Sequence, residues 1–262
     1  MAIADVSDKS LNDLISLQGK VAVITGGTKG IGLAISQRLA EAGATVLMAG
    51  RDRASADEAA ATITKGKAVG AQVEASDAAS LKALCDRAIN EFGQLDILVN
   101  NAGIYPFKPT LEVTDDEWRQ VIDVDLSGVF FASREAARRM IEGGRGGVII
   151  NISSLGGLRG GANAAAYAAA KHGVEGLTKS LAIEFGKMEI RVLSIAPTYI
   201  KTPGTEAMSD APNSDDQVER MPLGRVGVPD DIARAAVFCA SDLSVFMTGS
   251  TLYLDGGQMA LL

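Results

Sequence analysis

The chain has 262 residues, of which 47% are hydrophobic and 22% charged, and its net charge is −7. Nucleic acids and anionic membranes both bind basic surfaces, and this acidic sequence has no cluster of lysine and arginine that would form one. The composition therefore argues against either partner and is typical of a globular protein with one large domain or two small ones.

The beginning of the chain and its few cysteines bear on where the protein works. The first twenty residues lack the basic start and long apolar run of a secretory signal, and no apolar stretch reaches the ~20 residues of a membrane-spanning helix. We therefore expect a cytoplasmic protein. Cys85 and Cys239 fall in helix-like segments without metal-ligand spacing, which favours two buried thiols, with a disulfide as the alternative. No metal site is expected.

Seven apolar runs of strand length follow one another along the chain, most of them bounded by Gly, Asn, Asp or Pro. They cover residues 20–26, 44–50, 68–75, 95–100, 147–153, 190–197 and 250–256. Amphipathic segments with helical periodicity lie between them, among them 31–41, 78–91, 115–142 and 164–185. This alternation predicts an α/β fold, a doubly wound parallel sheet of about seven strands with helices on both faces. Because no linker or repeat interrupts it, we expect a single domain over residues 1–262.

Residues 198–223 form the one long irregular region, rich in Pro, Asp, Ser and Thr. A loop of this length inside a compact domain is usually a lid or a binding loop, and a disordered surface excursion is the alternative. We expect a substrate lid over 198–223.

Three glycines, Gly26, Gly30 and Gly32, lie between the first predicted strand and the helix that follows it. Glycines at such a junction allow a tight turn and let backbone N–H groups approach a pyrophosphate, while the helix N-terminus faces the negative charge. A glycine turn alone is a weak signal, but its position between strand and helix strengthens it. The segment is therefore a candidate dinucleotide-binding loop.

The stretch TGGTKGIG at 25–32 resembles the TGxxxGxG motif of the short-chain dehydrogenase/reductase family. Further motifs follow in that family's order, spanning residues 19–257: NNAG at 100–103, Ser154, YAAAK at 167–171, Pro197 and DGG at 255–257. The chain is similar in these respects to 3-oxoacyl-[acyl-carrier-protein] reductases and to sugar or polyol dehydrogenases. The resemblance implies a Rossmann-type fold and hydride transfer between a nicotinamide and a carbonyl or secondary alcohol, with Tyr167 as the proton donor.

The resemblance also implies which residues hold the nicotinamide cofactor. They come from the glycine loop, the ends of the second to sixth strands and the YAAAK helix. They are Gly26, Thr28, Lys29, Gly30, Ile31, Gly32, Arg51, Glu74, Ala75, Asn101, Ala102, Gly103, Tyr167, Lys171, Pro197, Ile200 and Thr202. Glu74 stands where the family has an adenine-binding Asp.

Charge at the end of the second predicted strand distinguishes NADP(H) from NAD(H). NAD-type sites place an acidic residue there for the ribose 2′-hydroxyl, but this chain has Gly50 followed by Arg51. A guanidinium can pair with a 2′-phosphate, and Lys29 would lie on the same side. We therefore predict NADP(H) as the cofactor. Because the acidic Asp52 follows Arg51 directly, NAD(H) remains the alternative cofactor, and an NAD-dependent alcohol or polyol dehydrogenase the alternative function.

Tyr167 and Lys171 are four residues apart in an alanine-rich helical segment, so they share one face of the helix. An ammonium near a phenol stabilises the phenolate, so this tyrosine could donate or accept a proton. Ser154 follows the fifth predicted strand, at the edge where open α/β sheets bind ligands, whereas Ser153 is expected to point the other way. The resemblance implies that Ser154 orients the substrate oxygen.

Asp125 stands where the family has an Asn that holds a water in a proton relay to the lysine. An aspartate is nearly the same size but brings a charge beside Lys171. We include Asp125 among the candidate catalytic residues, and a capped or kinked helix position is the alternative. His172, the only histidine, is turned off the Tyr167 and Lys171 face and is interpreted as structural.

Several side chains are candidates for the substrate pocket, with ordinary core packing as the alternative. They are Tyr105, Phe107, Leu155 and Tyr199, beside Ser154. Thr198 replaces the glycine that usually follows the family's Pro197, which puts the local backbone path in question.

Two other functions compete with the oxidoreductase. A non-catalytic NADP(H) sensor would be expected to lack part of the Ser, Tyr and Lys set, and a redox-neutral enzyme would be expected to lose the nicotinamide loop. Family members are mostly tetramers that pack through two long helices, here 115–142 and 164–185. Apolar residues on more than one face of these helices fit a second buried contact and so a homo-oligomer, which the resemblance implies is a homotetramer: Val129, Phe130, Phe131, Ala166, Leu177 and Leu181.

Overall fold

A seven-stranded sheet forms the centre of the protein in the computed structural model, which describes residues 5–205 and 218–261. All strand pairs are parallel and the order is β3-β2-β1-β4-β5-β6-β7. The strands are β1 (Val21–Thr25), β2 (Thr45–Gly50), β3 (Lys67–Gln72), β4 (Ile97–Asn100), β5 (Gly147–Ile152), β6 (Ile190–Pro197) and β7 (Thr251–Leu254). The predicted doubly wound α/β fold is therefore confirmed, with every strand close to its expected position.

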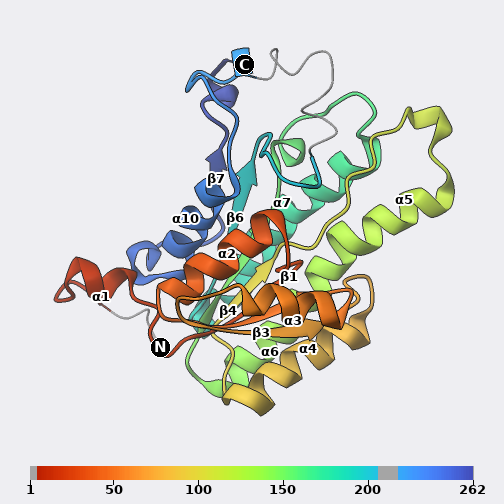
Figure 1. Ribbon diagram of the computed structural model, residues 1–262. Helices are drawn as coiled ribbons and strands as arrows, with labels where there is room; N and C mark the ends of the chain where they lie inside the picture. The colour runs from red at the N-terminus through yellow and green to blue at the C-terminus, as the bar shows by residue number, and fades with distance from the viewer. Residues whose placement is uncertain (1–4, 206–217, 262) are drawn as a thin grey trace.

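Two apolar layers cover the sheet, because alternate side chains of each central strand point to opposite faces. Ala22 and Ile24 of β1 pack against α2 (Gly30–Glu41) and α10 (Pro229–Ala240), with α3 (Arg53–Ala61) on the same side. Val21 and Val23 pack against the helices of the other layer, α4 (Ala78–Phe92), α6 (Gly128–Gly143) and α7 (Ala165–Phe185). Figure 1 shows α2 and α10 side by side in front of the sheet and the short α1 (Leu11–Ile15) projecting from it.

Local sequence signals set the ends of several helices. The Asp77 carboxylate accepts hydrogen bonds from the backbone N–H groups of Ala79 and Ser80 and so begins α4, which ends at Gly93 with φ +77°. Pro229 begins α10, where a missing N–H has no cost. The helices α3 and α10 were not among the amphipathic segments singled out from the sequence.

The predicted helix 115–142 is two helices joined by a π-helical turn. It consists of α5 (Asp115–Ile122), the turn Asp123–Ser127 and α6. A π-helical turn adds one residue to a helix without interrupting it, so hydrophobic periodicity alone does not reveal it. The turn places Asp125 on the inner side, where its side chain is fully buried.

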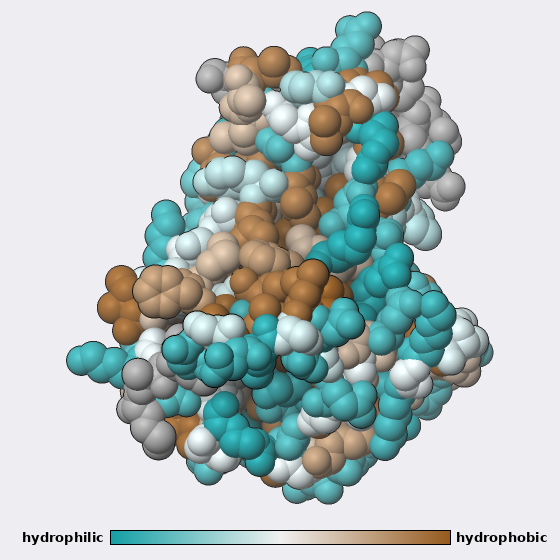
Figure 2. All heavy atoms as spheres, turned by 90° about the vertical axis from the view of Figure 1, so that its left-hand side faces the viewer, coloured by the Kyte–Doolittle hydropathy of each residue, from teal (hydrophilic) through white to brown (hydrophobic). Residues whose placement is uncertain are grey.

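The surface near the sheet edge β7 is partly apolar. Figure 2 shows apolar side chains gathered across the middle of the face that carries α10 and β7 in Figure 1. On the segments of this region, Phe246 is 97% exposed and Tyr253 of β7 is 51% exposed. No helix within residues 5–205 and 218–261 is long and apolar enough to cross a membrane. Cys85 and Cys239 are free, buried thiols, as predicted.

Candidate active site

A cavity of about 450 Å³ opens at the carboxyl ends of β1, β4, β5 and β6. Its walls come from the loops that follow these four strands and from the beginning of α7. The chain turns in opposite directions from β1 and β4, and ligands of doubly wound sheets bind at such a switch point. In the part of the predicted lid that the structure describes, residues 198–200 and 202–205 line this cavity, while residues 206–217 lie outside the described residues.

The glycine loop is packed so closely that side chains have no room. A Cβ on Gly32 would lie 2.1 Å from the carbonyl oxygen of Gly26, and one on Gly26 would lie 2.9 Å from Cα of Ala102. Gly26 and Gly30 also have positive φ values of +63° and +53°. The Asn101 side chain donates a hydrogen bond to the Gly26 oxygen at 2.9 Å and so ties this loop to the loop after β4. The result is a backbone cradle of the kind that receives a pyrophosphate.

Most of the predicted cofactor residues line the cavity. They are Gly26, Lys29, Gly30, Ile31, Gly32, Asn101, Ala102, Gly103, Tyr167, Lys171, Pro197, Ile200 and Thr202. The other four, Thr28, Arg51, Glu74 and Ala75, are not among its lining residues. Arg51 and Glu74 are exposed just beyond the ends of β2 and β3, and the Glu74 carboxylate accepts hydrogen bonds from Ser76 in its own turn.

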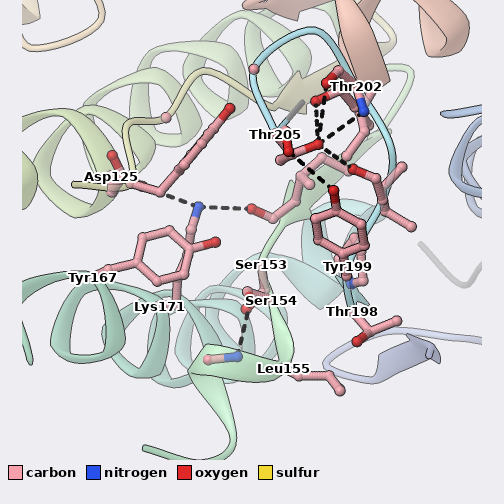
Figure 3. A pocket seen from close by; sticks show the side chains of 18 of the residues that line it. Asp125, Ser153, Ser154, Leu155, Tyr167, Lys171, Thr198, Tyr199, Thr202 and Thr205 are labelled. Atoms are coloured by element: carbon pink, nitrogen blue, oxygen red, sulfur yellow. Dashed lines mark hydrogen bonds and ion pairs between the residues drawn. The ribbon is translucent and has the colours of Figure 1, made fainter. Parts of the chain in front are cut away.

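Tyr167 and Lys171 meet inside the cavity, as their spacing predicts (Figure 3). The Lys171 Nζ lies 5.6 Å from the centre of the Tyr167 ring and donates a hydrogen bond of 3.1 Å to the carbonyl oxygen of Ile152. Phe107 packs edge-on against the Tyr167 ring, with 6.0 Å between ring centres. The lysine is therefore held from strand β5 while the tyrosine ring faces the cavity.

Asp125 forms a buried ion pair with Lys171. Oδ2 of Asp125 lies 3.4 Å from Nζ, and Oδ1 accepts a 2.8 Å hydrogen bond from the N–H of Ile104. Burial raises the pKa of Asp125, against the opposing effects of the ammonium and the Ile104 bond. The charge beside the lysine that the sequence predicted is thus present, carried by the π-helical turn.

Both serines at the end of β5 line the cavity. Ser154 accepts a 3.0 Å hydrogen bond from the N–H of Gly156, which leaves its own hydroxyl hydrogen free to donate. Ser153 was expected to point the other way, and the two hydroxyls have different neighbours. A Cβ on Gly156 would lie 3.3 Å from the Ser154 hydroxyl oxygen and 3.2 Å from the Tyr167 ring, whereas one on Gly157 would lie 2.8 Å from the Ser153 hydroxyl oxygen and 2.7 Å from the Lys171 backbone oxygen. The Ser153 hydroxyl is buried and has no hydrogen-bond partner among the described residues.

The predicted substrate residues Tyr105, Leu155 and Tyr199 also line the cavity. The Tyr199 hydroxyl donates a 3.0 Å hydrogen bond to the backbone oxygen of Thr205, and burial raises the pKa of Tyr105. Thr198, in the place of the family's glycine, donates its hydroxyl hydrogen to the Gln258 side chain.

Sequence reasoning missed several lining residues, most of them in the segment after Ser154. The missed residues are Ile152, Ser153, Gly156, Arg159, Gly160, Gly161, Ala164 and Ala168. The signal that could have found the residues after Ser154 is their position. Like Ser154, they follow the carboxyl end of β5, where open α/β sheets bind ligands.

A comparison with protein-family models decides the family. The model described as enoyl-(acyl carrier protein) reductase matches residues 26–259 of this chain. The chain belongs to the short-chain dehydrogenase/reductase family. It is therefore an oxidoreductase of the class that interconverts alcohol and carbonyl groups.

Two curated relatives and one solved structure are similar over nearly the whole chain. The 2-dehydro-3-deoxy-D-gluconate 5-dehydrogenase of Dickeya dadantii is 39% identical, covering 94% of this chain and 97% of its own. The NADP-dependent (R)-specific alcohol dehydrogenase of Lentilactobacillus kefiri is 40% identical, covering 93% and 98%. The crystal structure of a gluconate 5-dehydrogenase from Burkholderia cenocepacia, in complex with NADP and tartrate, is 36% identical with a TM-score of 0.92, covering 97% and 100%.

Proposed function

We propose that this short-chain dehydrogenase/reductase binds NADP(H) in the glycine-lined part of the cavity. There it would interconvert a small carbonyl compound and its secondary alcohol. The observation that carries the proposal is the meeting of Ser154, Tyr167 and Lys171 in one cavity with the backbone cradle. NADP(H), when bound, supplies or accepts the hydride. All three side chains are present, which argues against a non-catalytic sensor.

The protein's own residues would manage the substrate oxygen and its proton. Ser154, whose oxygen already accepts the Gly156 N–H, would donate its hydroxyl hydrogen to the substrate oxygen. Tyr167 would donate a proton to that oxygen during reduction and take it back during oxidation. The Lys171 ammonium would stabilise the phenolate left behind and is itself held by Ile152 and Asp125.

The preference for NADP(H) rests on the charges beyond β2. Neither Lys29 nor Arg51 forms an ion pair with a described residue, and both are exposed. Lys29 belongs to the glycine loop, and Arg51 follows Gly50, whose added Cβ would lie 2.9 Å from the side chain of Thr28 in that loop. Asp52, which kept NAD(H) open, caps α3 by accepting bonds from the N–H and hydroxyl of Ser55 at 2.8 and 2.7 Å. Its carboxylate is thus committed to the helix, and the guanidinium of Arg51 is left for a 2′-phosphate.

A fluorescence titration of NADPH and NADH tests the cofactor proposal. We expect wild type to bind NADPH more tightly and Arg51→Glu to weaken NADPH binding by at least about 10-fold, since a charge-assisted bond becomes a repulsion. NADH binding should change little. Arg53→Glu is the matched control, because Arg53 has the same charge but pairs with Asp57 at 2.7 Å. Equal affinities for the two cofactors in wild type would refute the NADP(H) preference.

Tyr167→Phe tests the catalytic part of the proposal. Loss of the proton donor should reduce kcat about 10²- to 10⁴-fold over a panel of ketones and keto sugars, while NADPH affinity stays near wild type. An unchanged kcat would remove Tyr167 from the mechanism. NADPH binding without turnover of any carbonyl or alcohol by wild type would favour the sensor.

We also propose a cytoplasmic homotetramer in which residues 1–262 form one domain and 198–223 form the substrate lid. The helix residues first offered for the contact do not all support it, because Val129, Ala166 and Leu181 are buried within the chain. Better support comes from Ile183 of α7 and Phe246 near β7, which are 83% and 97% exposed. Sedimentation equilibrium at micromolar concentration tests the assembly, and a monomer would contradict it.

A further inference from the structure

The cavity is more basic than the protein around it. Its described lining contains three basic residues, Lys29, Arg159 and Lys171, and one acidic residue, Asp125, although the whole chain carries −7. Asp125 is paired with Lys171. Lys29 belongs to the glycine loop, which the proposed function assigns to the cofactor. Arg159 is the cation that neither the cofactor nor the ion pair uses.

Arg159 lies on the substrate side of the cavity. It follows Ser154 by five residues in the segment after β5, and its N–H donates a 3.1 Å bond to the Leu155 oxygen. Strand β4 separates β5 from β1, which carries the glycine loop, so the two segments start roughly 10 Å apart at ~4.8 Å per strand. The segment that carries Arg159 therefore starts on the Ser154 side of the cavity, away from the phosphate cradle.

The segment that carries Arg159 is held in place, but its guanidinium is not. The N–H of Lys108, from the loop after β4, donates a 2.8 Å bond to the oxygen of Asn163 and so ties the two walls together. Arg159 is half-buried, and its side chain makes no hydrogen bond or ion pair with any residue of 5–205 or 218–261. A guanidinium that lines a cavity without a partner among the described residues is available to a ligand that enters it.

We propose that Arg159 binds a carboxylate of the substrate, so that this enzyme prefers hydroxy acids and keto acids to neutral alcohols and ketones. The inference rests on the proposed function, since it concerns the substrate of the same site. A guanidinium binds a carboxylate through two parallel hydrogen bonds, which would fix the substrate's orientation relative to Ser154 and Tyr167. A single guanidinium matches one negative charge, whereas a phosphate dianion would require further cations.

Paired substrates test this preference directly. With NADP⁺, kcat/KM would be measured for D-gluconate and for its neutral counterpart D-glucitol, in wild type, Arg159→Ala and Arg159→Lys. We expect wild type to favour the acid and Arg159→Ala to lose about 10- to 100-fold in kcat/KM for it, mainly through KM. The kcat/KM of Arg159→Ala for glucitol should stay within about 2-fold of wild type. For gluconate, Arg159→Lys should have a kcat/KM between those of wild type and Arg159→Ala, because lysine keeps the positive charge but cannot form the two parallel hydrogen bonds of a guanidinium.

Arg145→Ala is the matched control, because Arg145 is an exposed arginine just before β5, at the opposite end of the strand. Its removal should leave both substrates unaffected. Equal losses for acid and polyol in Arg159→Ala, or a wild type that favours the polyol, would overturn the proposal.

A binding measurement separates this inference from the hydride-transfer proposal. Calorimetric titration of tartrate into the NADP⁺-loaded protein needs no turnover. We expect Arg159→Ala to bind tartrate at least about 10-fold more weakly, with NADPH affinity unchanged. Equal tartrate affinity in the two proteins would overturn the carboxylate site even if hydride transfer occurs. A drop in NADPH affinity would assign Arg159 to the cofactor and overturn it as well.

Discussion

Removing Lys171 should destabilise the protein through the carboxylate that it leaves behind. Nζ of Lys171 and Oδ2 of Asp125 are 3.4 Å apart, with side-chain exposures of 6% and 0%. At an effective dielectric constant of about 20, this separation corresponds to an attraction of about 5 kcal/mol. Desolvation costs several kcal/mol per ion, so the intact pair is close to balanced, but Asp125 alone would be a buried charge without compensation.

We therefore expect Lys171→Met to lower the free energy of unfolding by about 3 kcal/mol at pH 7. Adding Asp125→Asn should restore about 2 kcal/mol, because the amide is neutral and can still accept the Ile104 N–H. Full recovery is not expected, since the bond from Lys171 to the Ile152 oxygen is also lost. Urea unfolding of wild type, Lys171→Met and the double variant at one protein concentration measures these values.

The dependence on pH provides a second check. The ammonium lowers the pKa of Asp125 against burial, so Lys171→Met should raise that pKa further. A carboxyl whose pKa is raised in the folded protein lowers the free energy of unfolding as the pH rises. The further its pKa is raised, the larger this loss of stability becomes. The gap between wild type and Lys171→Met should therefore shrink as the pH falls toward 4. A double variant no more stable than Lys171→Met alone would refute the reasoning.

Two further predictions concern other parts of the fold. The Arg225 guanidinium lowers the pKa of Asp231 to about 2. Asp231→Asn should therefore lower stability by about 1–2 kcal/mol at pH 7, a difference that is present above pH 4 and vanishes as the pH falls to 2. Gly32→Ala should weaken NADPH binding at least about 10-fold and lower the melting temperature, because its Cβ would lie 2.1 Å from a backbone oxygen. Gly93→Ala, with φ +77° and open space, should cost only about 1 kcal/mol and leave binding unchanged; similar binding by both variants would contradict the cradle.

The sheet was predictable because its central strands are buried on both faces. Every residue of Ile190–Pro197, for example, is buried, and such runs are apolar without alternation. The π-helical turn could not be predicted, because one extra residue in a helix changes the hydrogen-bond pattern more than the composition. The start of β3 at Lys67 was also missed, since that residue is exposed at the outer edge of the sheet.

Within the site, the motif residues were found because each follows a strand end or shares a helix face. Pairings between distant segments were harder to predict. The sequence indicated a charge near Lys171, but not that Ile104 would fix the other oxygen of Asp125. Arg159 was missed because a side chain between glycine-rich turns has no periodicity to indicate its direction.

The π-helical turn also constrains the length of the chain, in a way that substitutions alone would not reveal. An α-helix completes a turn in about 3.6 residues, and a π-helical turn holds about one residue more. Deleting one residue of Asp123–Ser127 would therefore convert this stretch to regular α-helix and leave α5 and α6 in nearly the same relative orientation. Val121 of α5 could still pack toward α7 and Ala136 of α6 against the sheet, but Asp125 would move around the helix axis and away from Lys171. Single-residue deletions here should be tolerated far less than conservative replacements, and a redesigned relative must keep this count to keep Asp125 inside.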